Sequence, residues 1–222
     1  MLNNIKGLLY PDEYFVKFFF RNKLNEMPDL NVLEIGCGNG NNLMLPYSFG
    51  ASITGIDIDQ EALEQAKHNF GCISKSDKFE LYLKDLRHPV GFISNLRANV
   101  FILASSVYYV SKLEFIEFLD DIMANNALEN NSFLYIRVRS KKDFRFGCGE
   151  RISSEGRYRM PVNSIVGEDN VELEFYDEYE IVSILKKHLK IKEFKVLNLD
   201  CQNEHNGNVV LNSDIVIWGR IN

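Results

Sequence analysis

The chain has 222 residues, of which 45% are hydrophobic and 25% charged, a balance typical of one globular domain with a substantial core. The formal net charge of −6 argues against extended nucleic-acid binding, which relies on many phosphate contacts. There is no apolar run long enough for a membrane span, no secretory signal pattern and no metal-ligand spacing among the four cysteines and four histidines, so a cytoplasmic protein without a metal is expected.

Helix and strand patterns alternate along the first 138 residues. Apolar side chains between two prolines predict a leading helix over 12–26. We then expect strands at 31–35, 52–57, 79–83, 100–104 and 133–138, and helices at 42–49, 60–70 and 112–125. The alternation predicts an α/β fold, a doubly wound and mostly parallel sheet whose strands end at one ligand-binding edge.

The C-terminal part departs from this alternation. A helix is expected over 177–189, followed by strands at 191–199 and 209–219 that can pair as an antiparallel hairpin across the polar stretch 200–208. The segment 140–176 is too long for a plain connection, which indicates a cap or lid after the fifth strand. We therefore expect a single domain over residues 1–222 with a small insertion.

A glycine-rich turn follows the first strand. The motif is acid-x-Gly-x-Gly-x-Gly, formed by Glu34, Gly36, Cys37, Gly38 and Gly40. Glycine permits positive φ and close approach of the backbone to a ligand, and Asn41 and Asn42 are possible caps for the next helix. Such a strand, turn and helix favour a nucleotide-type cofactor site, the alternative being a tight turn in an ordinary α/β protein. The third glycine comes one residue too early for a dinucleotide site, and Glu34 would repel a pyrophosphate but suit an α-amino group.

The second strand ends in another acid. Asp57 lies about 17 residues beyond Gly40, near the spacing at which a carboxylate meets ribose hydroxyls, and Asp59 is placed to cap the following helix.

These motifs resemble those of the class I S-adenosylmethionine (SAM) dependent methyltransferases. The resemblance covers about residues 5–138 by motif, and it implies a seven-stranded sheet with a terminal hairpin and SAM as cofactor. It assigns Asp57 to the ribose of SAM and Asp85 to the adenine amino group. It further implies that Ile58 and Leu86 sandwich the adenine ring.

The fourth strand should end beside the first, so Ala104 and Ser105 are expected to border the methyl group. Tyr108 and Tyr109 stand where related small-molecule enzymes often have histidines. Candidates for a general base are Tyr109, His88 and Glu150, although methyl transfer can rely on alignment and desolvation without a base. Tyr108 can equally be a packing residue.

The acceptor is expected to lie under the insertion. Residues 137–159 contain eight basic and three acidic residues, and arginine forks bind carboxylate or phosphate. We therefore expect Arg137, Arg139 and Arg145, with Tyr108, to face an anionic or sugar-type small molecule, unless the stretch is a solvated loop. Tyr10 is placed to close over the methionine end of SAM or to staple the leading helix.

The sequence thus predicts a SAM-dependent methyltransferase that acts on a small-molecule oxygen or nitrogen, with no membrane partner and no extended nucleic-acid binding. Two alternatives stay open. One is a non-catalytic SAM-binding regulatory subunit, and the other is a nicotinamide-dependent oxidoreductase, which the glycine spacing and Glu34 disfavour.

Overall fold

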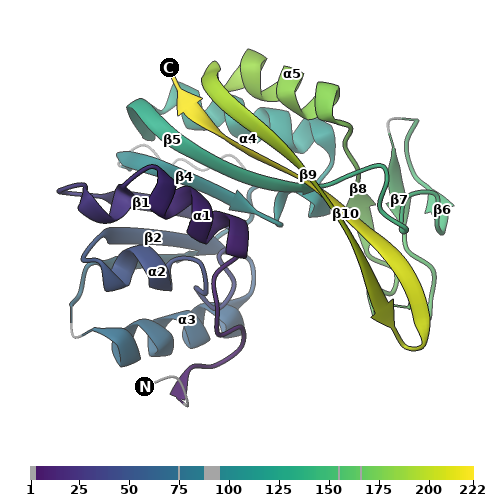
Figure 1. Ribbon diagram of the computed structural model, residues 1–222, viewed down its shortest axis with the longest axis horizontal. Coiled ribbons are helices and arrows are strands. Elements are labelled where there is room, and N and C mark those ends of the chain that lie inside the picture. The colour runs from purple at the N-terminus through teal and green to yellow at the C-terminus, as the bar shows by residue number, and fades with distance from the viewer. Residues whose placement is uncertain (1–3, 75, 88–95, 155, 166) are drawn as a thin grey trace.

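The computed structural model describes residues 4–74, 76–87, 96–154, 156–165 and 167–222. Its centre is a seven-stranded sheet with the order β3-β2-β1-β4-β5-β10-β9 (Figure 1). The strands are β1 (Asn31–Ile35), β2 (Ser52–Asp57), β3 (Phe79–Leu83), β4 (Ala98–Ala104), β5 (Leu128–Arg139), β9 (Ile191–His205) and β10 (Asn208–Ile221). Strands β1 to β5 pair in parallel, and β10 runs antiparallel to both β5 and β9. The predicted α/β sheet with its terminal hairpin is confirmed.

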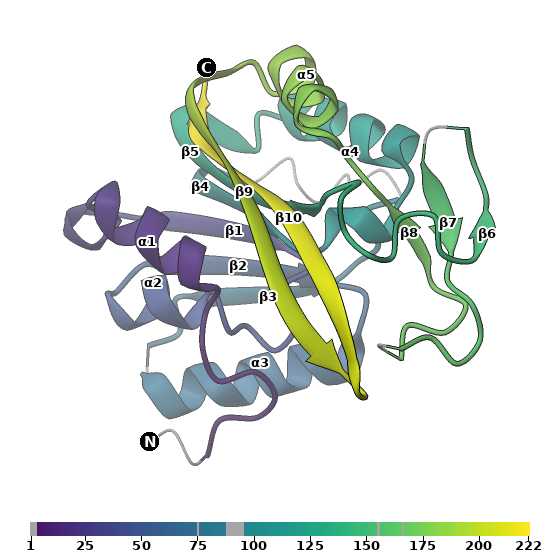
Figure 2. The same ribbon diagram turned by 45° about the vertical axis from the view of Figure 1, so that its right-hand side comes forward.

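Helices cover both faces of the sheet (Figure 2). On one face lie α1 (Glu13–Arg21), α2 (Met44–Ser48) and α3 (Gln60–Ile73), and on the other lie α4 (Lys112–Ala124) and α5 (Glu178–His188). Successive strand residues point to opposite faces, so Val32 packs with the first helix group while Leu33 packs with the second. The central strands β1 and β4 are therefore buried on both sides, as expected inside a parallel sheet.

Two helices are shorter than predicted. Helix α1 begins after Asp12, whose side chain accepts hydrogen bonds from the first-turn amides, and it ends at Arg21 because Lys23 adopts a left-handed φ of 54° before the short 3₁₀ turn η2 (Leu24–Glu26). Helix α2 begins at Met44 without a side-chain cap, so the expected capping by Asn41 and Asn42 is wrong. Asp59 does cap α3 as predicted.

The terminal hairpin is longer than predicted. Asn206 and Gly207 both have positive φ, 50° and 82°, and form a two-residue turn that keeps His205 paired with Asn208. Most of the polar stretch 200–208 is therefore strand, and the ribbon of β9 and β10 projects beyond the rest of the sheet (Figure 1).

The segment 140–176 forms a small antiparallel sheet of its own. Its strands are β6 (Glu150–Arg151), β7 (Arg157–Arg159) and β8 (Glu172–Glu174). It packs on the 3₁₀ turn η4 (Val107–Tyr109) through a core that contains Tyr108 and Phe175. Backbone contacts join it to the ribbon, for example from the amide of Phe144 to the carbonyl of Leu211. Within the described residues, no helix is both long and apolar enough to cross a membrane.

Candidate functional site

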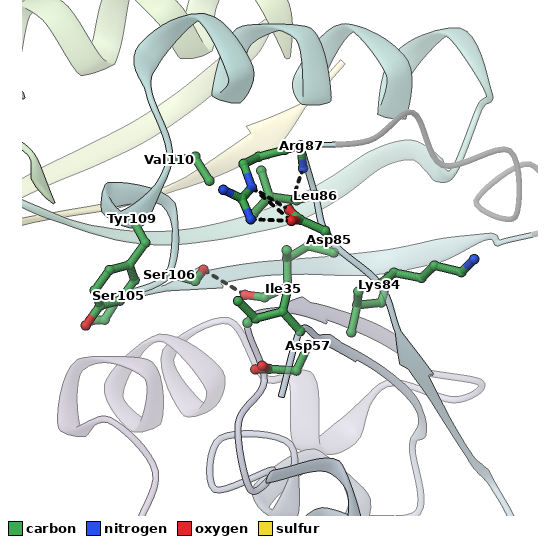
Figure 3. Close-up of a pocket in the computed structure, with 13 residues that line it drawn as sticks. Ile35, Asp57, Lys84, Asp85, Leu86, Arg87, Ser105, Ser106, Tyr109 and Val110 are labelled. Carbon is green, nitrogen blue, oxygen red and sulfur yellow. Dashed lines mark hydrogen bonds and ion pairs between the residues drawn. The ribbon is translucent and has the colours of Figure 1, made fainter. Parts of the chain in front are cut away.

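The glycine-rich turn connects the end of β1 to α2. Gly36 has a φ of +71°, and a Cβ there would lie 2.3 Å from Cβ of Ser106, so the turn needs glycine where it passes the end of β4. The Ser106 hydroxyl donates to the carbonyl of Ile35 at 2.7 Å, which fastens the ends of β1 and β4 together (Figure 3). A Cβ at Gly38 would meet no described atom within 4 Å, so this part of the turn faces open space.

Asp57 supports the turn from the end of β2. Its Oδ2 accepts from the amide of Gly38 at 2.7 Å, and its Oδ1 accepts from the amide of Asp59 at 3.0 Å. A carboxylate has about four acceptor positions, so both oxygens can still receive ligand hydroxyls. The acid is held in one orientation before any ligand binds.

An apolar cleft of about 430 Å³ opens at the ends of β1, β2 and β3 (Figure 3). We call it the apolar cleft, and its walls include Gly36, Asp57, Ile58, Leu86 and Ser105. Asp85 also lines this cleft, and both of its carboxylate oxygens accept from the guanidinium of Arg87. Sequence reasoning did not identify Arg87 as a partner of Asp85, although the two residues are only two positions apart.

A second pocket lies on the other side of the glycine turn. We call residues 8–12 the strap and this cavity the strap pocket. The strap forms one wall, and the glycine-rich turn with Ala104 and Ser105 forms the other. It shares Gly36 and Ser105 with the apolar cleft, so the two cavities meet at these residues. Tyr10 and Cys37 both line the strap pocket, whereas Gly40 lines neither cavity and packs against Phe70.

Three asparagines hold the strap on the turn. Asn39 donates to the carbonyls of Lys6 and Leu8, and Asn41 donates to the carbonyl of Tyr10 at 3.0 Å. The side-chain oxygen of Asn42 accepts from the amide of Asp12 at 2.8 Å. Asn41 and Asn42 were expected to cap a helix, and they instead bind a segment about 30 positions earlier in the chain.

Glu34 is buried beneath the turn and lines neither cavity. Its Oε1 accepts from Asn42 at 2.7 Å, and its Oε2 has no hydrogen-bond partner among the described residues. Burial, reinforced by the nearby Asp57 and Asp12, raises the pKa of Glu34 to about 8 despite the Asn42 hydrogen bond. Burial likewise raises the pKa of the Cys37 thiol, which makes it an unreactive packing residue.

Two of the three candidate bases, Tyr109 and Glu150, are poorly suited to abstract a proton. Tyr109 stands at the rim of the apolar cleft, but burial and the neighbouring Tyr108 raise its pKa, so it is a neutral hydroxyl at physiological pH. Glu150 is exposed on β6 and pairs with Arg159 at 2.7 Å, away from both cavities. His88 lies outside the described residues. Tyr108 is buried in the core of the insertion, which favours its packing role.

The arginines predicted to face an anion are already paired with acids. Arg137 binds Asp12 and Asp214, and Arg145 binds Asp143 and Glu168. The local excess of positive charge is thus neutralised largely by residues distant in sequence, and the expectation that these arginines face an acceptor stays a prediction. Arg139 is the partial exception, since its carboxylate neighbours Asp214 and Glu168 lie at 3.9 and 3.8 Å.

Comparison with known proteins finds similarity to methyltransferases. Residues 32–125 match the family model described as "Methyltransferase domain". Curated relatives include a tRNA1(Val) (adenine(37)-N6)-methyltransferase of Phocaeicola vulgatus, 34% identical over 85 residues, which are 38% of this chain and 35% of that protein. A ribosomal protein L11 methyltransferase of Shewanella halifaxensis is 41% identical over 56 residues, 25% of this chain and 19% of that protein. The chain therefore matches about a third or less of the length of these relatives.

Solved structures share the whole fold. A SAM-dependent methyltransferase from Methanosarcina mazei superposes with a TM-score of 0.66 at 20% identity, over 91% of this chain and 97% of that one. The N-methyltransferase NodS from Bradyrhizobium japonicum, solved with S-adenosylhomocysteine (SAH), gives 0.59 at 15% identity, over 94% and 86%. Residues 32–125 thus match a methyltransferase family model, within a chain that has the fold of solved SAM-dependent methyltransferases.

Proposed function

We propose that this protein transfers a methyl group from SAM to a small polar acceptor. The observation that carries the proposal is the meeting of the apolar cleft and the strap pocket at Gly36 and Ser105. A SAM-shaped ligand has an apolar ring at one end and a zwitterion at the other, and the two cavities differ in the same way. SAM supplies an electrophilic methyl group on a sulfonium sulfur.

The residues present fit this cofactor. In the proposed arrangement, Ile58 and Leu86 contact the adenine ring, and Asp57, already oriented by the Gly38 amide, accepts from the ribose hydroxyls. The ammonium end enters the strap pocket above Glu34. Glu34 does not line this pocket, so a cation there acts on the buried carboxyl by its charge, which favours the ionised form.

The protein's contribution to methyl transfer is alignment and exclusion of water. Ser105 lies where the two cavities meet, next to Ala104 of the strap pocket, and in this arrangement the acceptor approaches the methyl group there. A buried approach desolvates the acceptor and restricts its direction, and both effects lower the barrier of an in-line displacement.

The charge distribution favours a small acceptor over RNA. The relatives named above act on tRNA and a ribosomal protein, but the matches span only 85 and 56 residues. Binding of an RNA backbone requires several unpaired cations on one surface. Here the net charge is −6, and the arginines at 137, 145, 157 and 159 are each paired with carboxylates.

Calorimetry tests the cofactor assignment. We expect SAM and SAH to bind and NAD to fail, and we expect Asp57→Ala to weaken SAH binding about tenfold or more, because two hydroxyls lose their acceptor. Asp59→Ala is the matched control, since Asp59 caps α3 and lines neither cavity. NAD binding, or equal effects of the two substitutions on SAH, would contradict the assignment.

A further inference from the structure

A third cavity, which we call the polar cleft, lies between the start of α1, the end of β5 and the projecting ribbon. Its volume is about 570 Å³. It adjoins the strap pocket, because Asp12 of the strap pocket is ion-paired with Arg137 of the polar cleft. Its charged walls are formed by Glu13, Arg137, Arg139, Asp143, Arg145, Asp200 and Asp214. The cleft thus mixes guanidiniums and carboxylates at close range.

Part of this cleft is rigidly built. The side chain of Asp143 is almost fully buried, and its oxygens accept from Arg145 at 2.9 Å and from the amide of Ser213 at 3.0 Å. Arg145 also donates to the side-chain oxygen of Asn212 at 3.3 Å. Charged groups held this way need no rearrangement before a ligand binds, which reduces the entropic cost of recognition.

Arg139 is the wall residue with donors to spare. Its guanidinium stacks on the Tyr108 ring at 4.6 Å, and its Nη2 donates to the Tyr108 hydroxyl at 3.2 Å. Nε and Nη1 have no hydrogen-bond partner in the described part of the chain, although the side chain is only 12% exposed. Buried donors are normally satisfied. Each of these two nitrogens exposes less than 1 Å² of its own surface, so a ligand oxygen in the cleft can meet them once the Arg139 side chain turns toward the cleft.

The neighbouring carboxylates define what that oxygen must be. Asp214 lies 3.9 Å from Nε, too far for a direct hydrogen bond. A ligand hydroxyl about 2.8 Å from each group can accept from the guanidinium and donate to the carboxylate at once. A carboxylate or phosphate cannot donate, and it would face the four acids of the wall against three arginines.

We propose that the polar cleft binds the methyl acceptor, and that this acceptor is a neutral polyhydroxylated ring, that is, a sugar. The proposal rests on the methyltransferase function proposed above and adds the acceptor class and its binding residue. Each ring hydroxyl can both donate and accept a hydrogen bond. Neighbouring hydroxyls therefore suit a wall in which guanidiniums and carboxylates lie side by side, as Arg139 and Asp214 do and as the fixed pair of Arg145 and Asp143 does. A ring held there lies next to the Asp12 wall of the strap pocket.

The two exposed cysteines provide a test without mutation. Cys201 lines the polar cleft, whereas Cys148 lies in the insertion and serves as an internal control. Alkylation of each thiol by iodoacetamide is followed by peptide mass spectrometry, with SAH saturating. We expect methyl α-D-glucopyranoside, methyl α-D-galactopyranoside or methyl α-L-rhamnopyranoside to slow alkylation of Cys201 several-fold and to leave Cys148 unchanged. Equal rates at Cys201 with and without each of the three sugars would overturn the proposal.

Substitution identifies the binding residue. We expect Arg139→Gln to weaken binding of the protective sugar about tenfold, measured by calorimetry with SAH present, because a charge-assisted hydrogen bond is lost. Arg157→Gln is the matched control, since Arg157 is also 12% exposed and has an unsatisfied Nη1, yet lies in β7 outside the cleft. If Arg139→Gln does not fold, Cys201→Trp fills the cleft from an exposed position and must abolish sugar binding.

The outcomes separate the two proposals. Absence of SAH binding in the wild type refutes the methyltransferase function itself. SAH binding with no sugar binding, with protection only by glucose 6-phosphate, or with equal sugar affinity in Arg139→Gln and wild type refutes the sugar site and leaves the cofactor assignment intact.

Discussion

Replacement of Glu34 by glutamine is expected to stabilise the cofactor-free protein, and increasingly so as the pH rises. The buried carboxyl has a pKa of about 8 against an ordinary value of 4.5. Below pH 4.5 both the folded and unfolded forms carry the proton, and the group has no effect on stability. Between pH 4.5 and 8 the unfolded chain ionises while the folded one stays protonated, so the stability of the wild type falls as the pH rises.

The size of the effect follows from the width of this interval. At 1.36 kcal/mol for each pH unit, the penalty is about 3 kcal/mol at pH 7 and about 5 kcal/mol above pH 8. Glutamine keeps an oxygen that can accept from Asn42, as Oε1 does now at 2.7 Å, and it cannot ionise. The substitution therefore removes the penalty with little loss of packing.

Urea unfolding between pH 5 and 9, without SAM, measures the difference. The free energy of unfolding of Glu34→Gln should exceed that of the wild type by an amount that grows from about 1 kcal/mol at pH 5 to several kcal/mol at pH 8. Glu129→Gln, at an exposed position of β5, is the control and should follow the wild-type curve. Parallel curves for Glu34→Gln and wild type across this range would refute the buried, protonated carboxyl.

Two further predictions concern the turn and the strap. Gly36→Ala should destabilise the protein by about 3 kcal/mol or more in thermal unfolding and abolish SAH binding. Gly147→Ala is the control, because Gly147 also has a positive φ but faces open space, so this variant should show only the cost of backbone strain. Equal losses of stability in the two variants would refute the contact of Gly36 with the end of β4. Asp12→Ala should cost about 3 kcal/mol in urea unfolding at pH 7, because it leaves the Arg137 charge with one fewer partner and removes the cap of α1. Burial raises the pKa of Asp12, but hydrogen bonds and the Arg137 charge lower it overall, so Asp12 contributes to folding stability above pH 3.8 and loses this contribution as the pH falls below that value. If Asp12→Ala lowers the free energy of unfolding by less than about 1 kcal/mol, the pair with Arg137 is dispensable.

Features determined by neighbouring residues could be read from the sequence. The bounds of β1, β2 and β3 agree with the prediction, because short apolar runs flanked by turn residues define buried strands. Asp59 was identified as a cap from its position alone. The Asn206-Gly207 turn is an equally local signal, and the hairpin was underestimated because the polar residues around it were interpreted as a loop.

Features that join distant segments could not be read in this way. The excess of basic residues between 137 and 159 predicted a stretch that binds an anionic acceptor, but the arginines there pair with Asp12, Glu168 and Asp214. Asn42 has the residue type of a helix cap, and it instead links Glu34 to the backbone of Asp12. A side chain with several donors and acceptors serves any segment that the fold brings near, so composition alone does not identify its partner.

The proposed cofactor site and the proposed acceptor site differ in the part of the chain that forms them. The glycine turn, Asp57 and the rim of the apolar cleft all lie within residues 32–125, the part that matches the methyltransferase family. Every residue that lines the polar cleft lies outside it, at 13–14, 137–145 and 199–214. The proposed methyl-donor site therefore lies in the part that the family model matches, whereas the proposed acceptor site lies in segments outside that match. Relatives that act on tRNA or a ribosomal protein are consistent with this division, because they can share the first set of residues without sharing the second.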